Sequence, residues 1–183
     1  MARKSIDKTI VLKTAAQLAD TEGLEQVTLA AIAQRLGIKT PSLYNHIDGM
    51  NGLRKDLALY GIRKLTEEIT QASVGKAGDK AWLSIGTAYV SFARQHPGLY
   101  EATLPASIDH DIQAAGDTLI TLFLRVLEEY NLKEEEALHV VRGLRSLVHG
   151  FASLEHKGGF GLSLDHDESL RRLLETYLKG LHR

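Results

Sequence analysis

The sequence predicts an all-α protein. Apolar residues recur at spacings of three and four along most of the chain, which is the period of an amphipathic helix. Glycine, proline and capping residues separate these stretches, and no alternating run long enough for a strand is found. With 183 residues, of which 44% are hydrophobic, the chain is long and apolar enough to bury a core.

The first 52 residues predict three helices followed by a turn. A helix is expected over about residues 6–22. Thr28 is placed to cap the start of a short second helix, and Gly37 is placed to end it. A third helix opens at Lys39 or Thr40 and carries Pro41 in its first turn, where a missing N–H costs little. Residues 48–52 are expected to form a turn.

The rest of the chain predicts further helices separated by short breaks. Asp79 and Asp165 are expected as helix caps, and Asn131 is expected to separate two long helices. Residues 75–78 form the clearest linker. The expected helices cover about residues 53–73, 79–95, 99–104, 108–130, 133–156 and 165–180.

Residues 28–47 have the pattern of a helix-turn-helix. Ala33 is small enough for two helices to cross, and Gly37 tolerates the positive φ of a tight turn. This combination, with Pro41 and an exposed Tyr44, disfavours the alternative of a merely buried helical pair. We expect the apolar contacts between the two helices to be made by Ile32, Leu36, Ile38 and Leu43. The outer face of the second helix, available to base edges and phosphates, carries Lys39, Thr40, Ser42, Tyr44, Asn45 and His46.

The charge distribution agrees with a polyanionic partner for the N-terminal part. Residues 1–64 carry a net charge of +4, and the remainder carries −5. The chain has no cysteine, which excludes disulfides and a thiol nucleophile. Its start, MARKSIDKTIVLK, lacks the apolar run of a signal peptide, and no stretch is apolar enough to span a membrane. We therefore expect a cytoplasmic protein without membrane contact.

The run VTLAAIAQRLGIKTPSLYNHIDGMNGLRKDLA resembles the DNA-binding domain of TetR-family regulators, a likeness covering about residues 5–60. The resemblance implies that the Thr28 hydroxyl caps the second helix and meets a phosphate. Many members carry a lysine where this chain has Met50, so that phosphate contact is absent or passes to Asn51 or Lys55. The recognition residues implied by the resemblance are Thr40, Pro41, Tyr44, Asn45 and His46.

The second half resembles one TetR-family C-terminal subtype through LRSLVHGFASLE at residues 144–155, centred on His149-Gly150. This resemblance implies no specific ligand. Together the two resemblances predict a helix-turn-helix domain over residues 1–52. A long helix then joins it to a helical ligand-binding and dimerisation domain over residues 53–183.

One helix face is a candidate wall for a small-molecule pocket. Trp82, Ile85, Tyr89 and Phe92 recur at helical spacing, so they form either ordinary core or a pocket lining. With Tyr100 and Phe123 they would suit a small apolar or aromatic effector.

A stripe of small residues lies on the penultimate predicted helix: Gly143, Ser146, Gly150 and Ser153. Glycine inside a helix costs about 1 kcal/mol relative to alanine, so two on one face indicate the close approach of another helix. That helix comes from the same chain or from a second subunit. We expect a homodimer interface here, with Leu173 and Tyr177 supplying apolar contact.

No enzyme motif is found in the sequence: it has no GxSxG, P-loop or GxGxxG pattern. The eight histidines do not show the paired spacing of a structural zinc site, so we expect no metal and no cofactor. The sequence thus predicts a ligand-responsive repressor that binds a palindromic operator as a homodimer. The alternative is a helical small-molecule-binding protein or enzyme with an accessory DNA-binding domain.

Overall fold

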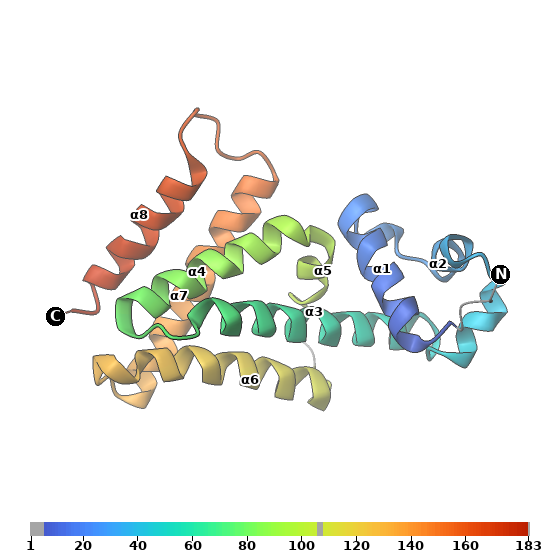
Figure 1. The fold of residues 1–183 in the computed structure, drawn as a ribbon, viewed down its shortest axis with the longest axis horizontal. Coiled ribbons are helices and arrows are strands. Elements are labelled where there is room, and N and C mark those ends of the chain that lie inside the picture. Colours follow the sequence, from blue (N-terminus) through green and yellow to red (C-terminus); the bar gives the residue numbers. More distant parts are fainter. Residues whose placement is uncertain (1–5, 106–107, 183) are drawn as a thin grey trace. The chain divides into compact units, whose positions relative to one another are not determined.

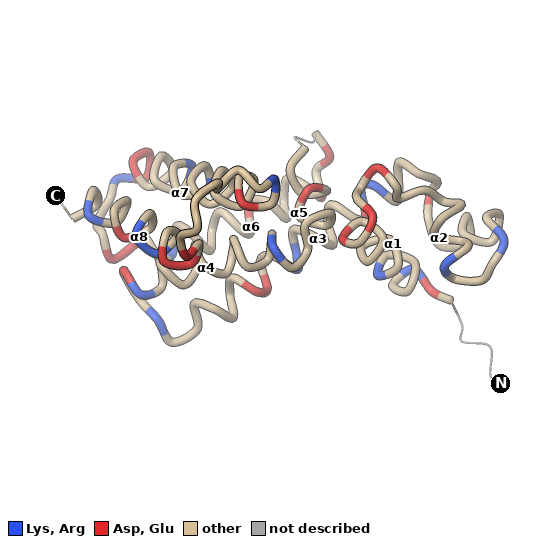
Figure 2. The backbone as a smooth tube through the Cα atoms, turned by 90° about the horizontal axis from the view of Figure 1, so that it is seen from above, with Lys and Arg blue, Asp and Glu red and all other residues tan. Residues whose placement is uncertain are grey.

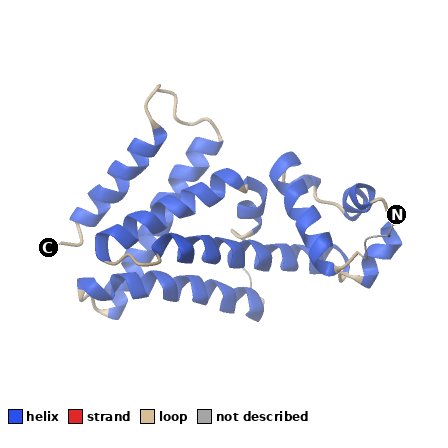
Figure 3. Cartoon of the chain, viewed as in Figure 1, coloured by secondary structure: helices blue, strands red, loops and turns tan. Residues whose placement is uncertain are grey.

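The computed structural model describes residues 6–105 and 108–182. Over these residues the chain forms helices and loops with no strand, which confirms the all-α class (Figures 1 and 3). The α-helices are α1 (Lys8–Glu22), α2 (Leu29–Leu36), α3 (Gly49–Ser73), α4 (Gly78–Gln95), α5 (Pro97–Ala102), α6 (His110–Leu127), α7 (Glu134–His156) and α8 (His166–Lys179). Three short 3₁₀ helices lie between them: η1 (Leu24–Gln26), η2 (Thr40–Asn45) and η3 (Glu128–Tyr130).

The chain divides into two compact units. Unit 1 comprises residues 1–63 and 95–115, and unit 2 comprises residues 64–94 and 116–183. The helix α3 contributes residues to both units. The sequence predicts a different boundary, between residues 52 and 53, which separates a DNA-binding domain from a ligand-binding and dimerisation domain. This functional boundary stays a prediction.

In unit 1, α1 and α5 are held in close contact. A Cβ atom on Gly98 would lie 2.0 Å from the carbonyl oxygen of Ala19, so only glycine lets the two backbones approach this far. The Asp20 carboxylate accepts a hydrogen bond of 2.8 Å from the Leu99 backbone N–H and lies 2.8 Å from Nδ1 of His96. The start of α5 is thereby fixed against the end of α1.

In unit 2, the core is built where α4, α7 and α8 meet. Trp82 of α4 is fully buried and stacks on Tyr177 of α8, with ring centroids 6.1 Å apart and planes inclined by 6°. The Tyr177 hydroxyl donates a hydrogen bond of 3.1 Å to the backbone carbonyl of Val140. Burial raises the pKa of Tyr177, which keeps this hydroxyl protonated as a donor.

Several predicted caps are confirmed. The Thr28 hydroxyl accepts from the Ala31 N–H at 3.1 Å, and Asp165 accepts from the Glu168 N–H at 2.8 Å. Gly37 has left-handed φ and ψ of 65° and 32° at the end of α2, and Asn131 has a φ of 50° after η3. Short-range capping chemistry can therefore be predicted from the sequence.

Four local predictions were wrong. The expected third helix is the 3₁₀ helix η2 rather than an α-helix. The expected turn over 48–52 is mostly helical, because α3 begins at Gly49, directly after Asp48. The short helix expected over 99–104 is α5, which starts earlier, at Pro97, and ends at Ala102, consistent with the place of a proline in a first helical turn. Asp79 lies inside the first turn of α4, where its carboxylate accepts a hydrogen bond of 2.5 Å from the Tyr130 hydroxyl.

Candidate DNA-binding interface and ligand pocket

The helix-turn-helix is formed by α2, the turn after it and η2. The turn is closed by a backbone hydrogen bond of 3.0 Å from the Ile38 N–H to the Ala33 carbonyl. Ile32, Ala33 and Leu43 are buried, while Leu36 and Ile38 are half-buried. The residues expected to join the two helices therefore do so, and they leave the opposite face of η2 uncovered.

That opposite face carries the side chains expected to meet DNA. Tyr44 is 60% exposed although it is aromatic, and it is the largest exposed side chain of η2. Thr40 and His46 are partly exposed. Exposed side chains complete the predicted set: Thr28, Lys39, Pro41, Ser42, Asn45 and Asn51. Their contact with DNA stays a prediction.

Ion pairs inside unit 1 engage two of the cations near the helix-turn-helix. Arg35 pairs with Glu22, so it holds α2 to α1. Lys55 lies 2.8 Å from Asp109 and 2.7 Å from Asp111, and hydrogen bonds to these carboxylates raise the pKa of Lys55. Lys55 is thus engaged by two carboxylates in the DNA-free chain, and a phosphate contact by Lys55 or Asn51 in place of one at Met50 stays a prediction. Lys39 makes no ion pair with any described residue.

Acidic and basic positions are interspersed along the chain rather than gathered in one continuous basic stripe (Figure 2). Within residues 28–47 the only Lys or Arg residues are Arg35 and Lys39. Because Arg35 is paired, the motif itself offers DNA one unpaired cation per chain. The exposed groups that this motif presents are therefore mostly hydroxyl, amide and aromatic groups.

Comparison with known families agrees with this geometry. Residues 11–57 match the family model described as "Bacterial regulatory proteins, tetR family". Residues 82–177 match the one described as "Tetracyclin repressor-like, C-terminal domain". The chain belongs to the TetR family. The second match includes His149-Gly150, whose assignment to a particular TetR-family subtype stays a prediction.

Individual TetR-family relatives point the same way. The chain is 38% identical over 180 residues to the uncharacterized HTH-type transcriptional regulator YobS of Bacillus subtilis, covering 98% of this chain and 94% of YobS. It is 34% identical over 92 residues to the HTH-type transcriptional repressor DrrR1 of Streptomyces coeruleorubidus, covering 50% of this chain and 33% of DrrR1. The protein is thus a DNA-binding transcriptional regulator of the TetR family.

Solved structures show the same fold. A protein of unknown function from Rhodococcus sp. RHA1 has a TM-score of 0.86 at 20% identity, covering 100% of this chain and 98% of that one. A single-residue variant of TetR from Acinetobacter baumannii, solved in complex with minocycline, has a TM-score of 0.73 at 17% identity, with 98% of each chain covered.

All six side chains expected to contact an effector are buried. Trp82, Ile85 and Phe92 are fully buried, and Tyr89, Tyr100 and Phe123 nearly so. Tyr100 belongs to unit 1 and the others to unit 2. They form core in this structure, and their role in effector binding stays a prediction.

The small-residue stripe of α7 has two different surroundings. A Cβ atom on Gly143 would lie 2.0 Å from Oη of Tyr177, so here the approaching helix is α8 of the same chain. A Cβ atom on Gly150 would meet nothing within 4 Å. Ser146 is exposed, and Ser153 is partly exposed. The stripe therefore packs within the subunit at Gly143 and borders open space at Gly150, and its place in a dimer interface stays a prediction.

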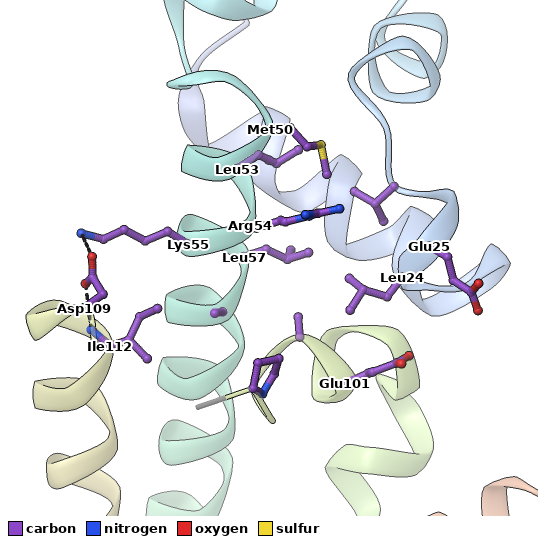
Figure 4. A pocket seen from close by; sticks show the side chains of 14 residues that line it. Leu24, Glu25, Met50, Leu53, Arg54, Lys55, Leu57, Glu101, Asp109 and Ile112 are labelled. Carbon is purple, nitrogen blue, oxygen red and sulfur yellow. Dashed lines mark hydrogen bonds and ion pairs between the residues drawn. The ribbon is translucent and has the colours of Figure 1, made fainter. Parts of the chain in front are cut away.

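The structure adds a pocket that sequence reasoning missed. It lies in unit 1, has a volume of about 560 Å³, and opens between η1, the start of α3, α5 and the start of α6 (Figure 4). The sequence indicates this pocket only through Leu53 and Leu57, which lie four residues apart on α3. Their spacing is equally typical of residues in a hydrophobic core. Its lining comprises Leu24, Glu25, Val27, Met50, Leu53, Arg54, Lys55, Leu57, Ala58, Glu101, Ala102, Pro105, Asp109 and Ile112.

The described residues contain no group of three or more His, Cys, Asp or Glu side chains placed to hold a metal ion. Over the same ranges, no helix combines the length and the apolar character needed to cross a bilayer.

Proposed function

We propose that this TetR-family regulator is a repressor that binds a palindromic operator as a homodimer and responds to a small apolar or aromatic effector. The observation that carries the proposal is the face of η2, where Tyr44 and its polar neighbours are exposed while Leu43 beneath them is fully buried. Repression is supported by DrrR1, a relative named as a repressor. A regulator that meets chromosomal DNA works in the cytoplasm, and we assign it no catalytic activity.

Dimerisation is supported by the surface of α7 and α8. A hollow of about 390 Å³ between these helices is lined by Leu147, Leu173, Tyr177 and Leu181, among others. Leu154 of α7 is 52% exposed, and Gly150 leaves open space on the same helix. A second copy would cover these apolar groups, and two copies would present two recognition segments to the two half-sites of an operator.

Effector binding near Trp82 is supported by one polar atom. The indole Nε1 of Trp82 is buried and has no hydrogen-bond partner among the described residues. A buried donor without an acceptor costs about 1–3 kcal/mol, and an effector that supplies an acceptor would recover part of it. One structural neighbour, the TetR variant from Acinetobacter baumannii, was solved in complex with a small molecule, minocycline.

Operator binding is tested by gel-shift titration at several salt concentrations. Tyr44→Ala and His46→Ala should weaken binding to all sequences by about tenfold if each removes a phosphate contact worth about 1.4 kcal/mol. Thr40→Ala should instead change the preferred operator sequence. Thr118→Ala on α6 is the matched surface control and should bind as the unaltered protein does. Unchanged binding by all three interface variants would overturn the proposal.

Effector binding has a separate readout in the single tryptophan of the chain. A compound that contacts the α4 face should change the emission of Trp82, and it should lower operator affinity if it is the effector. A tenfold release of DNA needs about 1.4 kcal/mol of coupling between the two sites. A compound that releases DNA while leaving Trp82 emission unaltered would exclude this face as its site.

A further inference from the structure

The unit 1 pocket is lined by residues that flank the helix-turn-helix on both sides in the sequence. Leu24, Glu25 and Val27 immediately precede Thr28, the cap of α2, and Met50 follows the recognition segment by a few residues. A ligand that fills the pocket would therefore contact both the segment that enters the motif and the segment that leaves it. A volume of about 560 Å³ is within the range of small-molecule sites.

The walls of this pocket are mostly apolar. Leu53 and Leu57 are fully buried on α3, and Ala58 and Ala102 are nearly so. Leu53 and Leu57 face the pocket together with Leu24 (Figure 4), and Ala58 and Ala102 also line it. Such a lining favours a ligand with a flat or extended apolar body.

One exposed arginine, Arg54, lines the pocket beside these apolar side chains. Arg54 extends from α3 toward Leu24, on the side opposite to Lys55 (Figure 4). It makes no hydrogen bond or ion pair with any residue that the structure describes. Lys55, by contrast, is neutralised by Asp109 at 2.8 Å. Arg54 is therefore the cation of the pocket with donors to spare, and its planar fork matches a carboxylate.

The acidic groups narrow the ligand class further. The carboxylates of Glu25 and Glu101 end on the same side of the pocket as the Arg54 guanidinium, away from Asp109, and both side chains are exposed (Figure 4). They would repel a second negative charge held beside the one that pairs with Arg54. A molecule with one carboxylate at Arg54 and an uncharged apolar body avoids this repulsion.

We propose that the unit 1 pocket binds an apolar monocarboxylate through Arg54 and that its occupancy lowers operator affinity. The second part of this proposal, the regulatory half, states that occupancy lowers operator affinity. It rests on the proposed function, because it presupposes that the chain binds an operator. The physical link is direct, since the ligand contacts Leu24 and Met50 on the two flanks of the motif. Occupancy changes operator affinity to the extent that the ligand prefers the DNA-free arrangement of these flanks.

The first experiment is calorimetric titration of the full chain with 2-naphthoate, without DNA. Arg54→Gln should weaken 2-naphthoate binding by at least about tenfold, since it removes a charge-assisted pair. The neutral isostere 2-naphthamide should bind the unaltered chain and Arg54→Gln equally. A dianion, 2,6-naphthalenedicarboxylate, should bind the unaltered chain more weakly than 2-naphthoate does. Arg63→Gln, an exposed arginine of the same helix outside the pocket, is the matched control and should leave all affinities unchanged.

A second variant tests the location independently of charge. Ala58→Phe should fill the pocket and abolish binding of both 2-naphthoate and 2-naphthamide. Absence of 2-naphthoate binding to the unaltered chain, or equal binding by Arg54→Gln, overturns the assignment of the site.

The regulatory half is measured by gel shift with and without saturating 2-naphthoate. The regulatory half is supported if 2-naphthoate lowers the operator affinity of the unaltered chain but not that of Arg54→Gln. It is overturned if 2-naphthoate leaves the operator affinity of both proteins unchanged. A chain that binds 2-naphthoate through Arg54 yet binds no operator supports the site and overturns the proposed function instead. The two failures are thus distinguishable.

Discussion

Tyr177 shows how one side chain can account for two features of the sequence. Its ring stacks on Trp82, and its hydroxyl lies where a Cβ atom of Gly143 would be. The glycine in the middle of α7, unfavourable for the helix by about 1 kcal/mol, is therefore explained by packing within the subunit. The same contact removes Gly143 from the residues freely available to a second subunit.

Gly143→Ala should destabilise the folded chain by about 1–3 kcal/mol, because Tyr177 must move away from its hydrogen bond to Val140. The effect should shrink in a Tyr177→Phe background, where the hydroxyl is gone, giving a measurable coupling between the two substitutions. Urea titration followed by Trp82 emission measures all four proteins. If the free-energy changes of the two substitutions are additive, the destabilisation by Gly143→Ala does not arise from its contact with Tyr177.

Lys39 is the unpaired cation of the helix-turn-helix, so its contribution should be visible in the salt dependence of DNA binding. A homodimer places two copies at the operator. Lys39→Gln should therefore reduce the slope of log affinity against log salt by about 2, at about 0.9 per phosphate contact. Lys13→Gln on α1 is a control of the same charge change. A slope that falls equally in both variants would point to general charge rather than a contact at Lys39.

At the scale of the element, the contact between α1 and α5 is the tightest backbone approach among the described glycines. It brings Gly98 against Ala19, and Asp20 adds hydrogen bonds to the first turn of α5. Since α1 also carries the Glu22 partner of Arg35 in α2, the position of the helix-turn-helix within unit 1 depends on this contact. Its loss should thus affect both stability and DNA binding.

Gly98→Ala should destabilise unit 1 by at least about 1–3 kcal/mol, because the new Cβ atom meets backbone that cannot turn aside. Gly116→Ala is the matched control: it lies inside α6, and a Cβ atom there meets nothing within 4 Å. That control should stabilise the protein by up to about 1 kcal/mol. Thermal denaturation of the two variants measures the difference. Equal melting temperatures would contradict the importance of the backbone contact.

At the scale of the whole molecule, the proposed function needs a second copy of the chain. A palindromic operator presents its half-sites about one helical turn apart, and one recognition segment reads one half-site. The open space at Gly150 and the apolar hollow of α7 and α8 are the features of this chain that a second copy would use. The same two helices hold their own subunit together through Gly143 and Tyr177.

Gly150→Leu should therefore separate assembly from folding. A Cβ atom at this position meets nothing within 4 Å in the subunit, so we expect its stability to change little, whereas a closely packed partner helix would be displaced. Analytical ultracentrifugation should show more monomer, and gel shifts should show weaker operator binding. A variant that stays fully dimeric would place the interface away from Gly150.

The sequence by itself determined the helical class, the caps and the helix-turn-helix. These follow from interactions among residues close in the chain, such as Thr28 with Ala31 or the left-handed Gly37. The outer face of η2 could be predicted for the same reason, because burying Ile32 and Leu43 leaves few options for Tyr44. The start of α3 was missed because glycines at 49 and 52 have the composition of a turn, and local propensity yields to packing.

Only the tertiary structure decided which side chains meet across the fold. The partner of Gly143 is 34 residues away, that of Lys55 is 56 residues away at Asp111, and the pocket at Arg54 gathers four separate segments. Helical periodicity shows that Trp82 and Phe92 lie on an apolar face, but a core and a pocket wall have the same pattern. The difference depends on the volume left between packed helices, and that volume is set by residues distant in sequence.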